Sequence, residues 1–282
     1  PLHNEVIKKV LIDFCVRGEW EFTMLELVGA ISNGLEPKGV RGLTYQDGER
    51  IVANPARPRI KDLDRLPFPA RDLLPNHRYV GEIGGGERGS FTYATASRGC
   101  PFKCKFCSVP QFWPVRYTRS VANVLDEMEQ IAWEYNIGYV RFTDEMFGLS
   151  KRWTTEFCRG MVESGLDKEI AWSCDSRVDT MSVETLDEMR RANCRVIFYG
   201  IEFGSQRILD FSGKRTTLAQ IRETLDMTKR AGISPTGNFM LGYPTETVDT
   251  IEATCVMIPD SRVCPLPEAK NSAKLVAMHK LP

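Results

Sequence analysis

The chain carries no net charge, because its 282 residues include 37 basic and 37 acidic side chains. This balance argues against a partner held by bulk electrostatics, so we expect no nucleic-acid partner, although a local basic patch stays compatible with it. Apolar runs are short, and none approaches the roughly 18 residues that a membrane-spanning helix needs. The first residues, PLHNEVIKKV, lack the charged-then-apolar pattern of a signal peptide. We therefore expect a protein without a membrane span.

Histidine is scarce, with three residues, and the cysteines do not indicate a disulfide framework. There are nine cysteines, an odd number, and a chain of 282 residues is long enough to fold without disulfide staples. We therefore expect a cytoplasmic protein in a reducing compartment. In that setting clustered thiols indicate metal or redox chemistry, whereas scattered thiols are usually small buried hydrophobic groups.

Three of the cysteines, Cys100, Cys104 and Cys107, lie within the stretch ASRGCPFKCKFCSVP. A structural zinc site usually needs four ligands, often as two C-x-x-C pairs. Only Cys104 and Cys107 form such a pair, and no histidine lies nearby in the sequence, so zinc is poorly supported. Three thiolates on one short loop suit a four-iron cluster that leaves one iron open, and an open metal site can bind a substrate. The spacing therefore favours an iron–sulfur cluster over zinc.

From residue 91 onward, the chain alternates between strand-like and helix-like segments. Five strands are predicted, at residues 91–96, 137–147, 170–179, 195–205 and 234–244. A helical segment follows each strand, and one of them opens with a capping box formed by Thr217 and Gln220. Such alternation requires parallel strands joined by right-handed crossovers, hence an α/β barrel or an open doubly wound sheet. In both folds, ligands bind at the carboxyl ends of the strands.

The first part of the chain has a different organisation. An apolar run at residues 10–16 predicts a strand, residues 22–31 predict a helix, and Asp47-Gly48 predicts a hairpin turn. Proline and charged residues then dominate residues 54–90, which we interpret as an extended linker. The final residues, 259–282, show neither a strand pattern nor a helical stripe, and we treat them as an atypical tail.

The spacing C-x-x-x-C-x-x-C after the first strand of this α/β segment, with Phe106 before the last cysteine, resembles the radical S-adenosylmethionine (radical SAM) superfamily. The resemblance implies a partial TIM-like (βα)6 barrel over residues 91–258, with a [4Fe-4S] cluster held by Cys100, Cys104 and Cys107. In such enzymes the cluster's open iron binds S-adenosyl-L-methionine (SAM). Reductive cleavage of SAM then gives a radical that abstracts hydrogen from a small-molecule substrate. The resemblance also implies an electron donor such as flavodoxin or ferredoxin.

The same resemblance assigns residues to SAM. RFTDEMF resembles the motif whose acid contacts the SAM amino group, which would be Asp144 or Glu145. Arg177 stands where several relatives hold the SAM carboxylate, and Glu202 stands where relatives bind the ribose hydroxyls. FMLGYPTET resembles the segment on the adenine side and contains Gly242. No residue of this chain is assigned a catalytic role, because the cofactors supply the chemistry.

Other segments resemble a cobalamin-dependent subgroup that includes class B methyltransferases and the anaerobic magnesium-protoporphyrin cyclase. IDFCVRGEWEFTMLELVGAI is similar to the last strand and helix of a Rossmann-like cobalamin-binding domain, so residues 1–53 are interpreted as its remnant plus the hairpin. The earlier strands of that domain and a sixth barrel strand are missing from the sequence. We therefore expect a piece truncated at both ends, of doubtful activity on its own, with cobalamin bound by the full-length protein.

The leading hypothesis is a radical SAM enzyme that transfers a methyl group or functionalises an unactivated C–H position. One alternative is a radical SAM enzyme that does not use cobalamin. Another is a non-catalytic zinc- or iron-binding module, which a tetrahedral zinc ion with a fourth protein ligand would favour.

Overall fold

The computed structural model describes residues 4, 7, 12–82 and 88–260, so the predicted tail 259–282 lies almost entirely outside the described residues. The chain divides into two units, Pro1–Asp62 and Leu63–Pro282. The division lies inside the stretch 54–90 that the sequence predicts to be a linker. Within the described residues, no helix combines the length and apolar character needed to cross a membrane.

The first unit is a small antiparallel sheet with one helix. Its elements are β1 (Phe14–Val16), α2 (Glu21–Ser32), β2 (Leu43–Asp47) and β3 (Arg50–Ala53), with the strand order β1-β2-β3. The predicted hairpin is confirmed, because Asp47 pairs with Arg50 across the turn. The predicted helix is confirmed too, and its Leu27 packs on Leu43 and Tyr45 in a core of its own. The identification of this unit as a cobalamin-domain remnant stays a prediction.

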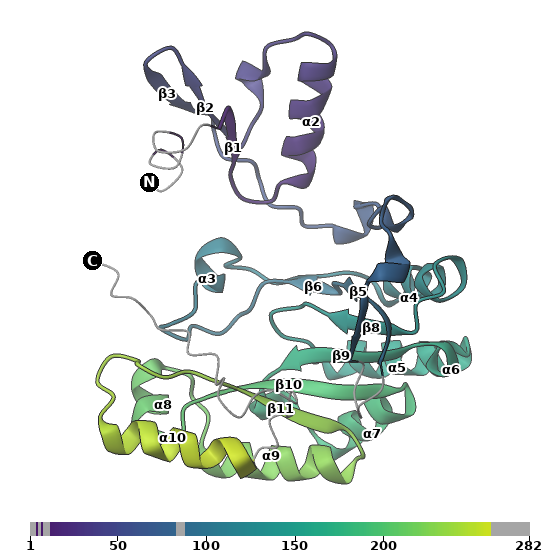
Figure 1. Ribbon diagram of the computed structural model, residues 1–282, viewed down its shortest axis with the longest axis vertical. Coiled ribbons are helices and arrows are strands. Elements are labelled where there is room, and N and C mark those ends of the chain that lie inside the picture. The colour runs from purple at the N-terminus through teal and green to yellow at the C-terminus, as the bar shows by residue number, and fades with distance from the viewer. Residues whose placement is uncertain (1–3, 5–6, 8–11, 83–87, 261–282) are drawn as a thin grey trace. The chain divides into compact units, whose positions relative to one another are not determined.

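The second unit contains the sheet that positions the site. Its strands are β4 (Val80–Glu82), β5 (Arg88–Ala94), β8 (Tyr139–Phe142), β9 (Ala171–Ser176), β10 (Cys194–Glu202) and β11 (Ser234–Phe239). Their spatial order is β11-β10-β9-β8-β5-β4, and every pairing is parallel except that of β4 with β5 (Figure 1). The five predicted parallel strands are therefore confirmed, and they curl into a partial barrel.

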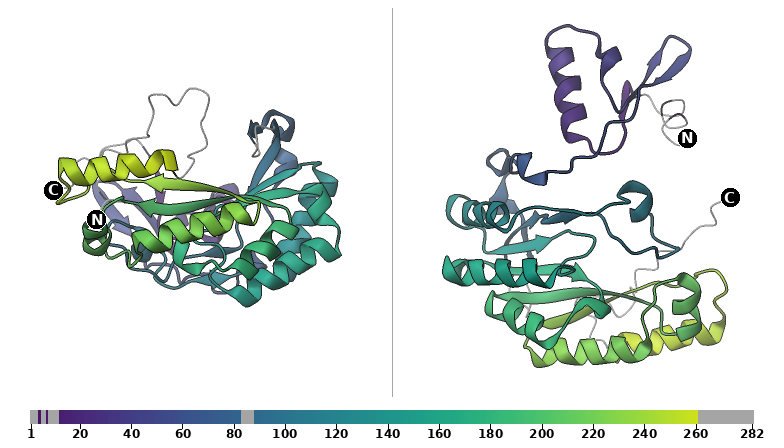
Figure 2. Two further views of the ribbon diagram at one scale, coloured as in Figure 1. Left: turned by 90° about the horizontal axis from the view of Figure 1, so that it is seen from below. Right: turned by 180° about the vertical axis from the view of Figure 1, so that it is seen from behind.

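The main helices are α4 (Val121–Glu129), α5 (Lys151–Glu163), α7 (Val183–Arg191), α9 (Leu218–Arg230) and α10 (Val248–Asp260). The first four pack side by side in this order along the sheet (Figure 2). Local sequence sets where they begin: Ser120 and Ser182 cap α4 and α7, and the Thr217–Gln220 capping box of α9 is confirmed. Short helices α3 (Val109–Phe112), α6 (Leu166–Glu169) and α8 (Gln206–Ser212) were not predicted.

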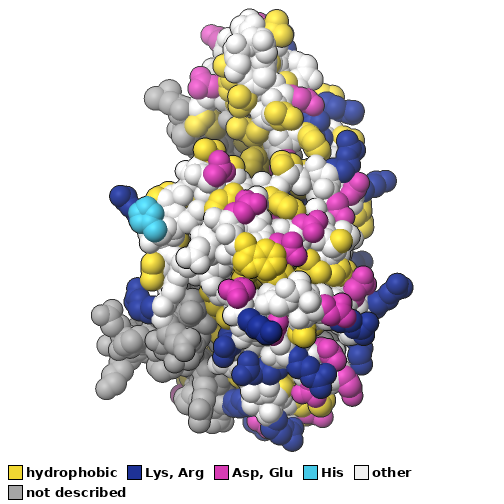
Figure 3. All heavy atoms as spheres, turned by 90° about the vertical axis from the view of Figure 1, so that its right-hand side faces the viewer, with side chains coloured by type: hydrophobic (Ala, Val, Ile, Leu, Met, Phe, Trp, Pro, Cys, Tyr) yellow, Lys and Arg dark blue, Asp and Glu magenta, His cyan; other side chains and the backbone are white. Residues whose placement is uncertain are grey.

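The core of this unit lies between the sheet and these helices. Aromatic rings dominate it, because Phe142 of β8 meets Phe157 of α5 and Trp172 of β9 edge-on at 5.6 and 5.7 Å between ring centroids. The indole N–H of the fully buried Trp172 donates to the Ala192 carbonyl at 2.7 Å, so its one polar group is satisfied. At the surface, basic and acidic side chains are interspersed on the face shown in Figure 3, in keeping with the zero net charge.

The stretch predicted to be an extended linker is more structured than expected. It contains three 3-10 turns, Leu63–Arg65, Arg71–Leu73 and Asn76–Arg78, and then β4, which extends the sheet beyond β5. Within this stretch, Arg71 is only 2% exposed and binds the buried Glu127 of α4 at 2.7 Å. An ion pair between residues this far apart cannot be predicted from the local sequence pattern.

Candidate functional site

The cysteine loop follows β5 and is closed at its base by a short ribbon. The two strands of this ribbon, β6 (Ser97–Arg98) and β7 (Tyr117–Thr118), are antiparallel. Gly99 has a φ of +97°, and a Cβ there would lie 2.6 Å from the Val115 carbonyl oxygen. Only glycine fits this position, so the chain can turn sharply just before Cys100.

The loop presents its three thiols as free, half-buried groups. The Cys107 amide donates to the Cys104 carbonyl at 3.0 Å, and the Lys105 amide donates to the Ser212 carbonyl at 2.8 Å. Burial raises the pKa of the Cys100 thiol, while a hydrogen bond from the Phe102 backbone amide and the charge of Arg177 act in the opposite direction. A bound metal would deprotonate such a thiol outright.

The donor set fits an iron–sulfur cluster. Among the described residues, no group of three or more His, Cys, Asp or Glu side chains is arranged around a point that could hold one metal ion. A [4Fe-4S] cluster does not need such convergence, because each thiolate binds a different iron. Cys100, Cys104 and Cys107 are the residues that would hold it.

Asp144 lies just after β8 and is turned into the fold. Its carboxylate accepts hydrogen bonds from the Ala96 amide at 2.9 Å and from the Ser97 hydroxyl, and it is 2% exposed. Burial raises the pKa of Asp144 to about 6, against the hydrogen bonds from Ser97 and Ala96 and the charge of Arg116, which lower it. Asp144 therefore fixes the turn that leads into the cysteine loop.

Glu145 faces the loop itself. One carboxylate oxygen accepts a hydrogen bond from the Gly99 amide at 2.9 Å, directly before Cys100, and the side chain is only partly buried. Of the two acids that the sequence offers for the SAM amino group, Glu145 is the one that borders the cysteine loop and keeps some exposure.

Arg177 lies at the end of β9 and is 6% exposed. Its guanidinium donates to both carboxylate oxygens of Asp179 at 2.8 Å and to the Lys214 carbonyl at 2.7 Å. Nη1 lies 3.6 Å from the Cys104 Sγ, and the group stacks on Phe102 at 3.9 Å. The structure therefore brings Arg177 to the cysteine loop, as predicted, but already bound to a carboxylate.

Glu202 ends β10 in an unusual conformation, with a φ of +69°. Its carboxylate pairs with the Lys214 ammonium at 2.8 Å, and the two side chains are 13% and 4% exposed. Gly200 makes room for this pair, since a Cβ there would lie 2.5 Å from the carboxylate. Sequence reasoning missed Lys214, because a lysine in a polar turn is usually exposed.

Gly242 lies in the loop after β11, exposed and with a φ of +82°. The next residue, Tyr243, is buried against Phe106 and Phe203, with ring centroids 6.2 and 5.1 Å away. Because Phe106 directly precedes Cys107, these rings hold the predicted adenine segment against the cysteine loop.

The predicted residues are therefore gathered around one loop. Glu145 accepts a hydrogen bond from the Gly99 amide, and Arg177 donates toward the Cys104 sulfur. Gly242 lies beside the loop because its neighbour Tyr243 packs on Phe106. Glu202 reaches it through Lys214, whose ammonium lies 5.9 Å from the centre of the Phe106 ring. Asp144 supports the loop from inside the fold. The geometry gives these side chains a common location, while their roles toward a cofactor stay predictions.

Comparison with known proteins gives the family. Residues 95–258, more than half of the chain, match the Radical SAM superfamily, and the chain belongs to this superfamily. An uncharacterized methyltransferase of Pyrococcus horikoshii is 37% identical over 244 residues, covering 86% of this chain and 52% of that protein. The anaerobic magnesium-protoporphyrin IX monomethyl ester cyclase of Rubrivivax gelatinosus is 33% identical over 267 residues, covering 92% and 47%. The chain thus spans about half the length of these curated relatives.

A solved structure shares the fold. The radical SAM methyltransferase TsrM from Kitasatospora setae, solved with cobalamin and a [4Fe-4S] cluster, matches with a TM-score of 0.70 at 20% identity. The match covers 89% of this chain and 50% of TsrM. It confirms the partial radical SAM barrel predicted for the second unit.

Proposed function

We propose that this chain carries the radical SAM site of a cobalamin-dependent enzyme that transfers a methyl group or functionalises an unactivated C–H position. The observation that carries the proposal is the set of three half-buried thiols on one loop, bordered by Glu145, Arg177 and Glu202 at the carboxyl ends of parallel strands. When bound, a [4Fe-4S] cluster and SAM supply the one-electron cleavage that starts radical chemistry.

The residues of this chain hold and orient those groups. Glu145 offers a carboxylate to the SAM amino group, an interaction between opposite charges at short range. Glu202 offers its carboxylate to the ribose hydroxyls, and the Lys214 ammonium fixes its orientation. Tyr243, packed on Phe106, holds the loop with Gly242 along the adenine side. The contacts of Arg177 within the fold favour another role for its guanidinium.

We also propose an acidic electron donor of the flavodoxin or ferredoxin type. Lys103 and Lys105 flank Cys104 and are both exposed, so they place positive charge where an electron must enter. Lys105 lies over the Phe211 ring at 4.7 Å, which holds its ammonium beside the loop. Complementary charge of this kind speeds encounter more than it tightens binding.

Cobalamin and a cytoplasmic location are proposed for the full-length protein. Support for cobalamin comes from the relatives, since TsrM was solved with cobalamin bound. Methyl transfer and cyclisation are both named among the relatives, as a methyltransferase and a cyclase. Support for a reducing compartment comes from the cysteines at positions 15, 158, 174, 194 and 255, which are free along with those of the loop.

The test is cleavage of SAM. The protein is reconstituted anaerobically with iron and sulfide, reduced with dithionite and incubated with SAM, and 5′-deoxyadenosine is measured by chromatography. We expect the wild type to form it and Cys104→Ala to lose it. Cys255→Ala is the matched control, because this thiol is free and exposed and belongs to α10 rather than to the cysteine loop. Wild-type protein that holds a four-iron cluster yet releases no 5′-deoxyadenosine would contradict the proposal.

A further inference from the structure

The guanidinium of Arg177 is held in place by contacts within the fold. Asp179 accepts from Nε and Nη2, both at 2.8 Å, in the two-pronged geometry that arginine makes with carboxylates. The Lys214 carbonyl takes a further hydrogen bond from Nη2 at 2.7 Å. Asp179 therefore takes the Nε–Nη2 edge, and the Lys214 carbonyl takes the Nη2 hydrogen of the Nη1–Nη2 edge. Neither edge is open to a second carboxylate in the two-pronged geometry.

What remains of the group faces the cysteine loop. Nη1 lies 3.6 Å from the Cys104 Sγ. The Phe102 ring, between Cys100 and Cys104, covers the guanidinium face at 3.9 Å. A nearly buried cation thus contacts the loop twice, once through an N–H donor aimed at sulfur and once through an aromatic stack.

We propose that Arg177 is a positioning residue of the iron–sulfur cluster, which donates a hydrogen bond to the Cys104 thiolate and raises the cluster's reduction potential. This inference rests on the proposed function, because it assumes that the loop holds the cluster. Hydrogen bonds to the sulfurs and nearby positive charge favour the more negative, reduced form of such a cluster. The role replaces the SAM-carboxylate contact that the family resemblance implies for Arg177, since Asp179 takes the Nε–Nη2 edge and the Lys214 carbonyl takes the remaining N–H of Nη2.

The experiment is a redox titration of the reconstituted protein, followed by EPR in the absence of SAM. Arg177→Met removes both donor and charge, and we expect the equilibrium constant for cluster reduction to fall about tenfold. For a one-electron couple this is a shift of about 59 mV to lower potential. Arg177→Lys keeps the positive charge but lacks the planar guanidinium, and we expect an intermediate shift of the reduction potential. Arg141→Met is the matched control, because Arg141 lies on the neighbouring strand and pairs with Asp175 rather than with the loop.

SAM binding separates the two roles of the guanidinium. The same proteins are titrated with SAM and followed by the change in the EPR signal, and we expect Arg177→Met to bind SAM within about threefold of the wild type. An unchanged potential together with SAM binding at least tenfold weaker would overturn the inference and return Arg177 to the carboxylate. If Arg177→Met does not assemble a cluster, the comparison is made on Arg177→Lys, where an unshifted potential overturns the inference.

Failure of the proposed function would look different. A wild-type cluster whose signal ignores SAM would count against the proposed function, while the potentials of wild type and variants would still decide whether Arg177 acts on the cluster.

Discussion

Asp144 and Glu145 are neighbours in the sequence, but their side chains contact different parts of the fold. Asp144 is buried and holds the Ala96–Ser97 turn, whereas Glu145 is half-buried and contacts the Gly99 amide next to the first cysteine. The sequence leaves the SAM amino group open between the two acids, and the structure supplies a physical reason to favour Glu145.

Glu145→Gln should therefore weaken SAM binding without unfolding the protein. Replacing a charged acceptor by a neutral one costs about 1.5–3 kcal/mol in a hydrogen bond to a cation, which is roughly tenfold to hundredfold in affinity. Affinity is measured by titrating SAM into the reconstituted protein under EPR, with urea unfolding as the check on stability. Asp144→Asn is the matched comparison, and a larger loss of SAM affinity in that variant than in Glu145→Gln would contradict the assignment.

Asp144 should make stability fall as the pH rises. Its folded-state pKa of about 6 lies above the reference value of 3.8, so the folded state holds the proton more tightly than the unfolded state. The stabilisation from this proton is present below about pH 4 and is lost by about pH 6, and is on the order of 3 kcal/mol. Urea unfolding of wild type and Asp144→Asn across this range measures it. The wild type should lose stability relative to the variant, and a constant difference would contradict the shift.

The three cysteines that would hold the cluster stand out in the sequence because thiols clustered on a short loop, without a disulfide framework, indicate a metal or redox site. Four polar residues could be placed near the loop because each lies toward the carboxyl end of a predicted parallel strand: Asp144, Glu145, Arg177 and Glu202. Their contacts could not be predicted. The Lys214 partner of Glu202 comes from a turn twelve residues later. The hydrogen bonds between Arg177 and Asp179 depend on the backbone conformation after β9.

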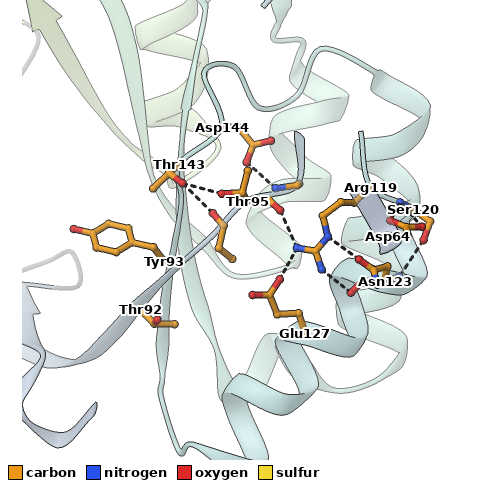
Figure 4. Close-up of polar contacts among 12 residues, drawn as sticks. Asp64, Thr92, Tyr93, Thr95, Arg119, Ser120, Asn123, Glu127, Thr143 and Asp144 are labelled. Carbon is orange, nitrogen blue, oxygen red and sulfur yellow. Dashed lines mark hydrogen bonds and ion pairs between the residues drawn. The ribbon is translucent and has the colours of Figure 1, made fainter. Parts of the chain in front are cut away.

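At the scale of elements, one buried acid joins three parts of the second unit. Glu127 of α4 is 1% exposed and receives Arg71 at 2.7 Å together with Arg119. Arg71 also donates to the Tyr93 carbonyl of β5 at 2.7 Å, and Arg119 donates to the Thr95 carbonyl at 2.8 Å. Figure 4 shows Arg119 between Glu127 and the end of β5, where the chain turns toward the cysteine loop. The network therefore anchors the stretch before the loop.

Glu127→Gln should destabilise the protein strongly. Removing one charge leaves two arginines without their counter-ion, and breaking a buried pair typically costs about 3–5 kcal/mol. Asp126→Asn is the matched control, since Asp126 lies on the same helix and is less buried than Glu127, and we expect a change within about 0.5 kcal/mol. Both are measured by anaerobic urea unfolding. Equal effects of the two substitutions would show that the network contributes little.

Elements with a long, regular pattern could be predicted, and short ones could not. The five parallel strands and their helices carry clear periodicity, and the Thr217–Gln220 box marks the start of α9. The two-residue strands β6 and β7 are too short to show alternation. The predicted helix after the cysteine loop also changes character, because α4 ends at Glu129 and a π-helical turn, Gln130–Glu134, follows.

At the scale of the molecule, the parallel sheet determines where the candidate site lies. The carboxyl ends of five parallel strands lie at one edge of the sheet. The cysteine loop and the residues that border it lie at or directly after these strand ends. The strand–helix alternation leaves a barrel and an open sheet as alternatives, and the partial barrel is implied by the family resemblance that the cysteine spacing carries. The antiparallel strand β4 could not be predicted, because it is only three residues long and lies in a stretch rich in proline and charge.

The most direct test of the central claim is EPR of the anaerobically reconstituted, reduced protein, recorded with and without SAM. We expect a four-iron signal that changes when SAM is added, because three thiolates leave one iron open to it. The signal should disappear in Cys104→Ala and persist in Cys255→Ala. A four-iron signal that is identical with and without SAM would mean that the loop holds a cluster without forming a SAM site, and it would rule out the proposed radical SAM site.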